Sequence, residues 1–322
     1  MILTVTLNAA VDVTYRLDRV ARHGSNRVTA PAERAGGKGV NVARVLAALG
    51  HDTVVTGLAG GATGEALRAD LATAGLRDEF VPIDGTTRRT VTVVEEELGD
   101  ATVYLEPGPT VSGAEWSHFT ARYRRLLRSA RAVVLAGSLP AGVPPDAYGR
   151  LVALAAQAGV PAVLDAEGAA LRAALAAGPA LVKPNQAELA ATTGPVDPLT
   201  GARRLRAAGA RAVVVSLGPG GLLASTPDGD WRARPPEPVR GNPTGAGDSA
   251  VAALTAGLVA GTPWPVRLAE AVALSAATVL APLAGSFDPV EHRQLLPRVR
   301  VRPVYPGSPA RPAAPQGDPC PS

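Results

Sequence analysis

Short, wholly apolar segments alternate with helical segments along most of the chain, and this alternation restricts the fold more than any other feature. Strands without polar positions are buried on both faces, so a mostly parallel sheet of such strands needs helices on both sides. The sequence therefore predicts an α/β fold, a three-layer α/β/α sandwich. The expected strands are Ile2–Leu7, Thr53–Leu58, Ala132–Ala136, Ala162–Leu164, Ala180–Val182, Ala212–Ser216 and Leu222–Ser225. The expected helices are Val40–Leu49, Glu65–Ala74, Ala114–Arg128, Asp146–Ala158, Ala169–Ala176, Thr200–Ala208, Gly247–Val259 and Val266–Leu280.

Two regions, about residues 12–31 and 86–106, do not follow this alternation of strand and helix segments. Within them, polar and apolar residues alternate instead. The second predicts a hairpin, in which Thr90–Glu95 and Thr102–Leu105 are joined by a turn at Gly99-Asp100. We expect the two regions to form a small β-sheet that stands off the main domain as a lid.

The composition predicts one large domain, over residues 1–302, in a cytoplasmic protein. Apolar residues make up 46% of the 322 residues, which is enough for a large core. No uncharged apolar run of about 18 residues stands out, so no membrane partner is expected. The N-terminus has no basic leader, and the only cysteine, Cys320, leaves no disulfide framework. Residues 303–322 are rich in Pro, Ala, Gly and Ser, and we expect a disordered tail there.

The charge pattern argues against nucleic-acid binding, because the net charge is only +4, the basic residues are spread out and aromatic residues make up 3%. One detail of this charge is more informative. Of the 32 basic residues only Lys38 and Lys183 are lysines, and both lie in motif-like segments. Because a compact ammonium group cannot be exchanged freely for a guanidinium, the two lysines favour a functional interpretation.

The segment Asn242-Pro-Thr-Gly-Ala-Gly-Asp-Ser249 joins a glycine-rich loop to the start of an expected helix. Free N–H groups and the helix dipole at such a start attract an anion, most often a phosphate. Asp248 would repel that anion unless it has a task such as removing a proton from an attacking hydroxyl, so the segment indicates phosphoryl transfer to an alcohol. The segment also satisfies the loose dinucleotide pattern G-x-G-x-x-A, but residues 240–244 do not form an expected strand, which argues against a Rossmann dehydrogenase.

Other segments are compatible with both a structural and a functional role. Gly36-Gly-Lys-Gly39 is a second glycine-rich entry into a helix, with Lys38 and Asn41 beside it. Asn185 and Glu188 have the spacing of a capping box and could equally hold a hydrated Mg²⁺. Asp12 follows a buried strand and is either a turn residue or a ligand-binding residue. The segment Ser216–Gly221 is a hairpin turn or a backbone surface for a nucleotide.

Together these motifs resemble the ribokinase-like carbohydrate kinases, in particular the phosphofructokinase-B group, over about residues 1–295. Gly36–Gly50 and Asn242–Ala250 resemble the two signature segments of that family. The opening Ile2–Tyr15 resembles its hexose-phosphate branch, the 1-phosphofructokinases and tagatose-6-phosphate kinases. Further similar segments are Ala136–Val143, Lys183–Leu189 and Val215–Gly218.

The resemblance implies a ribokinase-like fold and a role for each matching position. Asp248 would be the base, and the backbone of Gly245, Ala246 and Gly247 would be the anion hole. The sugar phosphate would be bound by Asp12, Gly37, Lys38, Asn41, Arg88 and Ser138. ATP would be bound by Lys183, Asn185, Ser216, Gly218 and Gly221, and Mg²⁺ by Asn185 and Glu188 through water.

The resemblance favours an ATP- and Mg²⁺-dependent kinase that converts fructose 1-phosphate to fructose 1,6-bisphosphate. Ala9, where the branch usually has Pro, and Thr90, where we expect Asn, are departures on the sugar side, so the acceptor is less constrained than the reaction. Tagatose 6-phosphate, fructose 6-phosphate, or an unphosphorylated sugar or nucleoside are alternative acceptors. A non-catalytic sugar-phosphate sensor is a further alternative, against which the intact Asp248 argues. A homodimer through an exposed edge of the lid is also possible.

Overall fold

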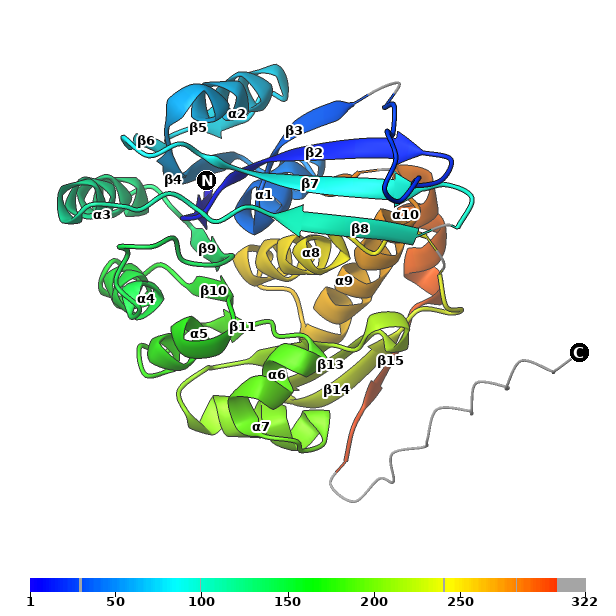
Figure 1. The fold of residues 1–322 in the computed structure, drawn as a ribbon. Coiled ribbons are helices and arrows are strands. Elements are labelled where there is room, and N and C mark those ends of the chain that lie inside the picture. The colour runs from blue at the N-terminus through cyan, green and yellow to red at the C-terminus, as the bar shows by residue number, and fades with distance from the viewer. Residues whose placement is uncertain (29–30, 99, 240, 282, 306–322) are drawn as a thin grey trace, which may run out of the picture.

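The structure, a computed structural model, describes residues 1–28, 31–98, 100–239, 241–281 and 283–305. Within these residues one large sheet has the strand order β15-β14-β13-β12-β11-β10-β9-β1-β4-β5, with β6 also paired to β4 (Figure 1). Its strands are β1 (Ile2–Thr6), β4 (Thr53–Ala59), β5 (Arg77–Asp78), β6 (Val81–Pro82), β9 (Ala132–Ala136), β10 (Ala162–Asp165), β11 (Leu181–Val182), β12 (Val213–Ser216), β13 (Leu222–Thr226), β14 (Gly229–Arg234) and β15 (Arg300–Pro303).

The middle of this sheet is parallel, as the sequence predicts. Strand β1 lies between β4 and β9, and every residue of these three strands is buried. The strands β12 to β15 pair antiparallel at one end of the sheet. Since parallel strands end at a common edge, the loops that follow β1, β9, β10, β11 and β12 gather along one side of the molecule.

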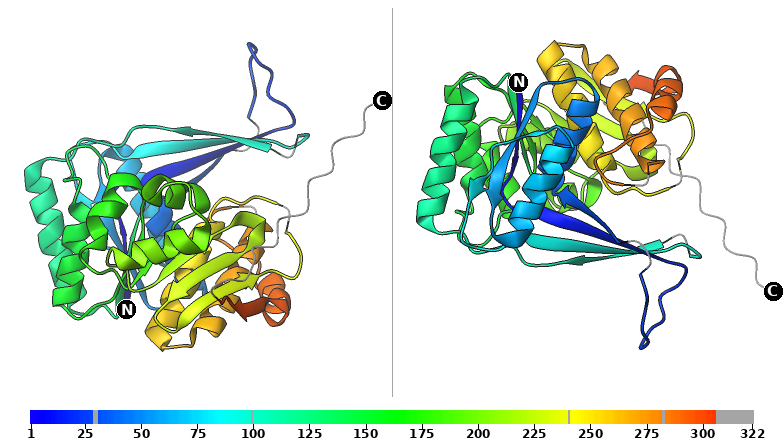
Figure 2. Two further views of the ribbon diagram at one scale, coloured as in Figure 1. Left: turned by 90° about the horizontal axis from the view of Figure 1, so that it is seen from below. Right: turned by 90° about the horizontal axis from the view of Figure 1, so that it is seen from above.

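Helices cover both faces of the sheet, which confirms the expected three layers (Figures 1 and 2). One face packs against helices α3 to α7 and the other against α1, α8 and α9. Helix α2 packs beside the base of the second sheet. The helices are α1 (Lys38–Ala48), α2 (Gly61–Thr73), α3 (Gly113–Leu127), α4 (Ala147–Gln157), α5 (Gly168–Leu175), α6 (Gln186–Thr193), α7 (Pro198–Ala207), α8 (Ala246–Ala260), α9 (Trp264–Val279) and α10 (Pro289–Leu295).

A second sheet of four strands, the lid sheet, projects from the main body (Figure 2). Its order is β3-β2-β7-β8, formed by β3 (Ala32–Gly36), β2 (Ala10–Leu17), β7 (Arg88–Glu95) and β8 (Asp100–Leu105). Strands β7 and β8 form the expected hairpin, although Gly99 of its turn lies outside the described residues. The sequence did not predict β3, because Ala-Glu-Arg-Ala-Gly has no β-branched residue. This segment is a strand because it pairs with β2.

The end of the domain differs from the expected boundary. Pro303, expected to begin the tail, lies in β15 opposite Trp231, and the N–H of Val304 donates to the carbonyl of Asp230 at 2.8 Å. The sheet therefore extends past residue 302, because β14 offers a free edge to this segment. The expected tail from residue 306 onward lies outside the described residues. Among the described helices, none combines the length and the apolar character needed to cross a membrane.

Candidate active site

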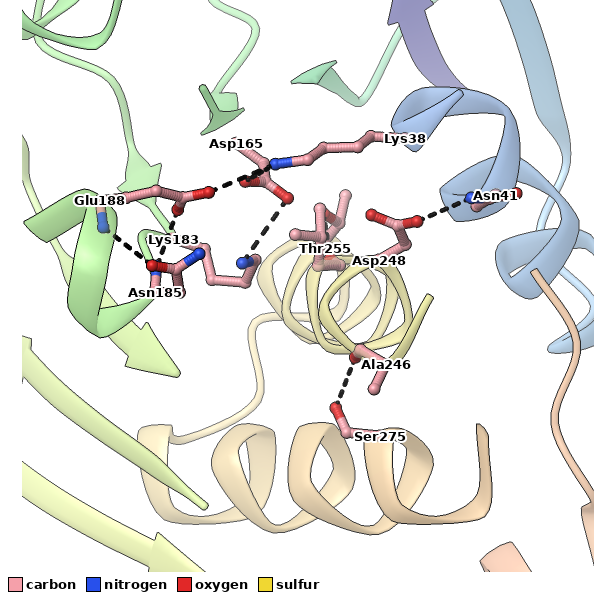
Figure 3. Close-up of polar contacts among 11 residues, drawn as sticks. Lys38, Asn41, Asp165, Lys183, Asn185, Glu188, Ala246, Asp248, Thr255 and Ser275 are labelled. Carbon is pink, nitrogen blue, oxygen red and sulfur yellow. Dashed lines mark hydrogen bonds and ion pairs between the residues drawn. The ribbon is translucent and has the colours of Figure 1, made fainter. Parts of the chain in front are cut away.

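The start of α8 has the geometry of an anion-binding helix end. Gly245 adopts a left-handed conformation, φ +84°, which allows the chain to turn directly into the helix. No side chain caps this helix start, while the Ser275 hydroxyl donates to the Ala246 carbonyl at 2.8 Å and fixes the first turn against α9 (Figure 3). No side chain competes for the N–H groups of this segment, although the N–H of Ala246 donates to the carbonyl of Pro243 at 3.2 Å. The positive end of the helix dipole faces the same place. The described part of the loop before α8 contains no strand, which excludes a dinucleotide-type strand–loop–helix unit.

Asp248 lies in the first turn of α8 and is 6% exposed. The Asn41 side-chain amide, on α1, donates a 2.8 Å hydrogen bond to its Oδ2 (Figure 3). Burial is the main cause that raises the pKa of Asp248 to about 7, and the negative charge of Asp165 adds to this rise. The Asn41 hydrogen bond and the charges of Lys38 and Lys183 act in the opposite direction. A carboxyl group with such a pKa is suited to accept a proton at neutral pH.

Asp165, at the end of β10, lies between the two lysines of the chain. Its Oδ1 lies 3.2 Å from Nζ of Lys38, and its Oδ2 lies 3.6 Å from Nζ of Lys183. Asp165 and Lys183 are almost fully buried, whereas Lys38 is partly exposed. Burial acts to lower the pKa of Lys38, but the carboxylates around it, chiefly Asp165 and Glu188, raise it above its usual value. Both ammonium groups are therefore paired with the Asp165 carboxylate at one place beside α8.

The capping box at the start of α6 is present. The Asn185 side-chain oxygen accepts from the N–H of Glu188, and the Glu188 Oε2 accepts from the N–H of Asn185, both at 2.8 Å. The second Glu188 oxygen, Oε1, lies 3.7 Å from Nζ of Lys38 (Figure 3). The cap thus also directs a carboxylate toward Lys38, so its structural role leaves one Glu188 oxygen on the side of the site.

The expected nucleotide-binding residues lie beside this cap. Asn185 forms an isolated parallel bridge with Ser216, and the N–H of Ser216 donates to the carbonyl of Pro184 at 3.0 Å. Gly218 and Gly221 have φ +55° and +82°, in the tight turn that joins the antiparallel strands β12 and β13. A Cβ atom on Gly221 would lie 2.1 Å from the carbonyl oxygen of Ala233, so only glycine fits where this turn packs against β14.

On the sugar side, a cavity of about 150 Å³ brings together most of the expected residues. Its lining includes Gly37, Lys38, Arg88, Ser138 and also Thr6 and Asn8. The Arg88 Nε donates to the carbonyl of Asn8 at 3.3 Å, and the Asn8 side-chain amide donates to the Ser138 hydroxyl at 3.0 Å. The acidic Glu167 also lines the cavity. The cationic side chains of Lys38 and Arg88 are suited to contact a phosphate group there.

Asp12 does not line this cavity but lies next to it in β2, in the lid sheet, so it is a strand residue and not the turn residue that the sequence also allowed. A Cβ atom on Gly36 would lie 2.1 Å from its carboxyl group, so only glycine leaves room for Asp12 there. Burial raises the pKa of Asp12 to about 6, while a hydrogen bond with Thr90 and the charge of Arg88 oppose this rise.

The sequence interpretation missed Asp165 and Asn8 as members of the site. Asp165 directly follows the expected strand Ala162–Leu164, and a carboxylate at the end of a buried parallel strand is the signal that had identified Asp12. Asn8 in turn follows the first strand, and its side-chain oxygen is buried without a hydrogen-bond partner among the described residues.

The donor set of the site fits a hydrated Mg²⁺ and not an all-protein metal cage. Among the described residues there is no group of three or more His, Cys, Asp or Glu side chains that could enclose a metal ion. Asp165 and Glu188 nevertheless direct two carboxylates to one place, as Lys38 contacts both. Mg²⁺ usually keeps several waters and takes one or two carboxylates together with substrate phosphates, which such a pair can satisfy.

Comparisons with known proteins agree with this geometry. The pfkB family carbohydrate kinases match residues 5–291. A mutant of phosphofructokinase-2 from Escherichia coli is 32% identical, with a TM-score of 0.86 over 92% of this chain and 98% of that chain. Structures of the same enzyme with fructose 6-phosphate and in a tetrameric inhibited form match over the same shares.

A possible 1-phosphofructokinase from Thermotoga maritima is 26% identical, with a TM-score of 0.87 over 94% of this chain and 99% of that chain. Ribokinase from Arabidopsis thaliana, solved with ribose and ATP, is 20% identical with a TM-score of 0.69 over 92% and 98% of the two chains, and shares the fold. The family match covers nearly the whole described domain, including α8 with Asp248 and the glycine-rich entry into α1. The chain belongs to the pfkB family of carbohydrate kinases.

Proposed function

We propose that this kinase transfers the terminal phosphoryl group of ATP to fructose 1-phosphate and gives fructose 1,6-bisphosphate. The observation that carries the proposal is the buried carboxylate of Asp248, with a pKa of about 7, at an uncapped helix start. A phosphate that approaches this helix start meets a base and hydrogen-bond donors together, which is the requirement for phosphoryl transfer to a hydroxyl.

Asp248 acts as the base in this mechanism. Because Asn41 holds Oδ2, we assign Oδ1 to the acceptor hydroxyl. Oδ1 takes the hydroxyl proton as the oxygen attacks phosphorus, and the bond from phosphorus to the ADP oxygen breaks. The raised pKa of Asp248, about 7, makes the carboxylate a stronger proton acceptor than an ordinary aspartate, which assists the attack.

The backbone of Gly245, Ala246 and Gly247 is the anion hole for the migrating group. Its N–H groups stabilise negative charge that is spread over the phosphoryl oxygens in the transition state. Nζ of Lys183 would lie 3.5 Å from a Cβ atom on Gly247, so this ammonium group borders the same place and can follow the phosphate from donor to acceptor.

For ATP we assign Lys183, Asn185, Ser216, Gly218 and Gly221, which follow one another along the sheet edge. Asn185 and Glu188 would hold Mg²⁺ through water, with Asp165 as a further carboxylate. When bound, Mg²⁺ neutralises charge on the ATP phosphates. The residues of the chain orient the phosphates and exclude competing water.

For the sugar we assign Asp12, Gly37, Lys38, Asn41, Arg88 and Ser138. Arg88 binds the phosphate already on the substrate, and the Asp12 carboxylate binds sugar hydroxyls. Lys38 lies at the border between acceptor and donor, since it lines the sugar cavity while its ammonium group contacts Asp165 and Glu188. This position allows it to contact the reacting phosphoryl group as well as the sugar.

For the acceptor sugar, a specific alternative to fructose 1-phosphate has to be considered. The similarity to a possible 1-phosphofructokinase favours fructose 1-phosphate, and the higher identity to phosphofructokinase-2 favours fructose 6-phosphate. Both sugars carry a phosphate at one end and a free hydroxymethyl group at the other, so Arg88 and Asp248 can serve either one. ADP release should be measured against fructose 1-phosphate, fructose 6-phosphate, tagatose 6-phosphate and fructose. The highest kcat/KM with fructose 1-phosphate would support the proposal, and a higher value with another acceptor would replace it.

Because the proposed donor is ATP, we also propose a cytoplasmic location. We further propose a homodimer that forms through the lid sheet. Strand β8 is an edge strand, and all of its residues are exposed. Val103, Tyr104 and Leu105 are 49%, 60% and 70% exposed, which is unusual for large apolar side chains on a free edge. Analytical ultracentrifugation should give a dimer for the unaltered chain and a monomer for Leu105→Arg. A monomeric unaltered chain at assay concentration would contradict the dimer.

A further inference from the structure

One hydrogen bond connects the lid sheet to the loop that supports the anion hole. Arg34, in β3 of the lid sheet, donates from Nη1 to the backbone carbonyl of Ala284 at 2.9 Å. Ala284 belongs to a turn between α9 and α10, 250 residues further along the chain. Neither the fold class nor the site motifs require this contact, so it needs its own explanation.

The Ala284 turn packs directly against the start of α8. A Cβ atom on Gly245 would lie 3.0 Å from Cα of Ala284 and 3.1 Å from the backbone nitrogen of Gly285. Gly245 is the left-handed residue from which the anion hole begins. The turn therefore packs directly against the residue at which α8 begins.

The same turn also touches the residue that holds the base. A Cβ atom on Gly285 would lie 3.0 Å from Oδ1 of Asn41, and the other end of this amide donates to Asp248 (Figure 3). The turn thus contacts both halves of the phosphoryl-transfer machinery, the anion hole through Gly245 and the base through Asn41.

At its other side, Arg34 faces the sugar-binding part of the lid. In the register of β2 and β3, Arg34 lies directly opposite Asp12. The charges that face its guanidinium group come from three elements: Asp12 on β2, Asp70 on α2 and Arg44 on α1. Burial and Arg44 lower the pKa of Arg34, while the two carboxylates oppose this. Arg34 is therefore a partly buried cation between the carboxylate of Asp12 and the Ala284 turn.

We propose that Arg34 is a positioning residue for phosphoryl transfer, which holds the Ala284 turn against Gly245 and Asn41 while its charge faces Asp12. This inference rests on the proposed kinase function. Because Nη1 of Arg34 donates to the backbone of a turn that touches Gly245 and Asn41, its loss should change the geometry of the reacting groups more than the binding of ATP. A displacement of about 1 Å at a reacting centre can lower a rate about a hundredfold.

The test compares Arg34→Met, which keeps the length of the side chain without a donor, with Arg34→Lys, which keeps a donor and a charge. Arg89→Met is the matched control, because Arg89 is an exposed arginine on strand β7 of the same sheet. We expect Arg34→Met to lower kcat between about 10-fold and 100-fold with less than about a threefold change in the KM for ATP. Arg34→Lys should regain most of the lost kcat, and Arg89→Met should retain the unaltered kcat. Melting temperatures of all variants separate this effect from a loss of folded protein.

A double-mutant cycle with Gly285→Ala examines the path itself. Gly285 has φ +71°, and its new methyl group would press on Asn41, so this change disturbs the same turn from its other end. If Arg34 acts through the turn, the combined loss of kcat will be smaller than the product of the two single losses.

Multiplicative losses would overturn the inference, as would equal kcat values for Arg34→Met and the unaltered enzyme. Equal losses in the Met and Lys variants would overturn it too. An unaltered chain without ATP turnover on any sugar phosphate would instead contradict the kinase function, and this inference with it.

Discussion

Asn41 and Asp248, 207 residues apart in the sequence, share a buried 2.8 Å hydrogen bond that joins the two glycine-rich helix starts of the chain. Asn41 belongs to α1, which begins at the Gly36–Gly39 loop, and Asp248 belongs to α8, which begins at Gly245. The contact fixes one carboxylate oxygen and favours the ionised form of Asp248. The amide of Asn41, which we assign to the sugar site, therefore also contacts the carboxylate that we propose as the base.

Replacing Asp248 by Asn should remove proton acceptance with little change in shape. We expect kcat to fall by about 10²–10⁴-fold, the usual contribution of a positioned general base. Steady-state assays should show KM values for ATP and sugar phosphate close to those of the unaltered enzyme. Turnover near the original rate, in a variant with the original melting temperature, would remove Asp248 from its assigned role.

The pH dependence of kcat should reflect the ionisation of Asp248. The base is active when ionised, so kcat should fall as the pH drops through about 7. In Asn41→Leu the carboxylate loses a hydrogen bond to its charged form, which raises its pKa further and moves the inflection to higher pH. An inflection at the same pH in both proteins would show that Asn41 does not adjust the base.

Asp165→Asn should move the same inflection in the opposite direction. The charge of Asp165 raises the pKa of Asp248, so its removal lowers that pKa and extends activity to lower pH. The variant also removes the ion pair between Asp165 and the buried Lys183, and we expect a loss of about 3 kcal/mol in the free energy of unfolding, measured with urea.

Asp197→Asn is the charge-matched control for this experiment, because Asp197 caps α7 on the surface. It should leave the inflection where it is. A shift of equal size in both variants would point to an effect of net charge and not of the contact with the two lysines.

Arg88→Ala tests whether the acceptor carries a phosphate. The loss of a charged hydrogen bond should raise the KM for a sugar phosphate about 10- to 100-fold, while the KM for an unphosphorylated sugar should stay the same. Arg89→Ala changes the neighbouring exposed arginine and should have no such effect. Equal changes for both kinds of sugar would argue against a phosphate site at Arg88.

The parallel sheet and its helices could be predicted because their signal is local. Segments such as Ala132–Ala136 are apolar at every position, and a short segment of this kind is typical of a strand that is buried on both faces. The capping box of Asn185 and Glu188 and the glycine segment before Asp248 are also local, because the spacing of the residues alone determines their geometry.

The features that the sequence did not predict depend on contacts between distant segments of the chain. Strand β3 has an ordinary polar sequence and is a strand only because β2 offers it a partner. Asp165 has a local signal, its place at the end of a strand, but its contacts with Lys38 and Lys183 depend on the fold. Arg34 has no sequence signal at all. The tail boundary at residue 303 was wrong for the same reason, since Pro303 pairs with a strand that the sequence pattern did not identify.

The position of β1 in the middle of the large sheet also determines the order in which the protein can assemble. Strand β1 has its two neighbours later in the chain, at residues 53–59 and 132–136, so during synthesis it cannot complete its pairing until the second of them has been made. Until then its apolar residues must be shielded from solvent by other parts of the protein, such as early helices, or by a chaperone. Deleting residues 2–6 would therefore divide the sheet in two, whereas deleting β15 would remove only an outer strand.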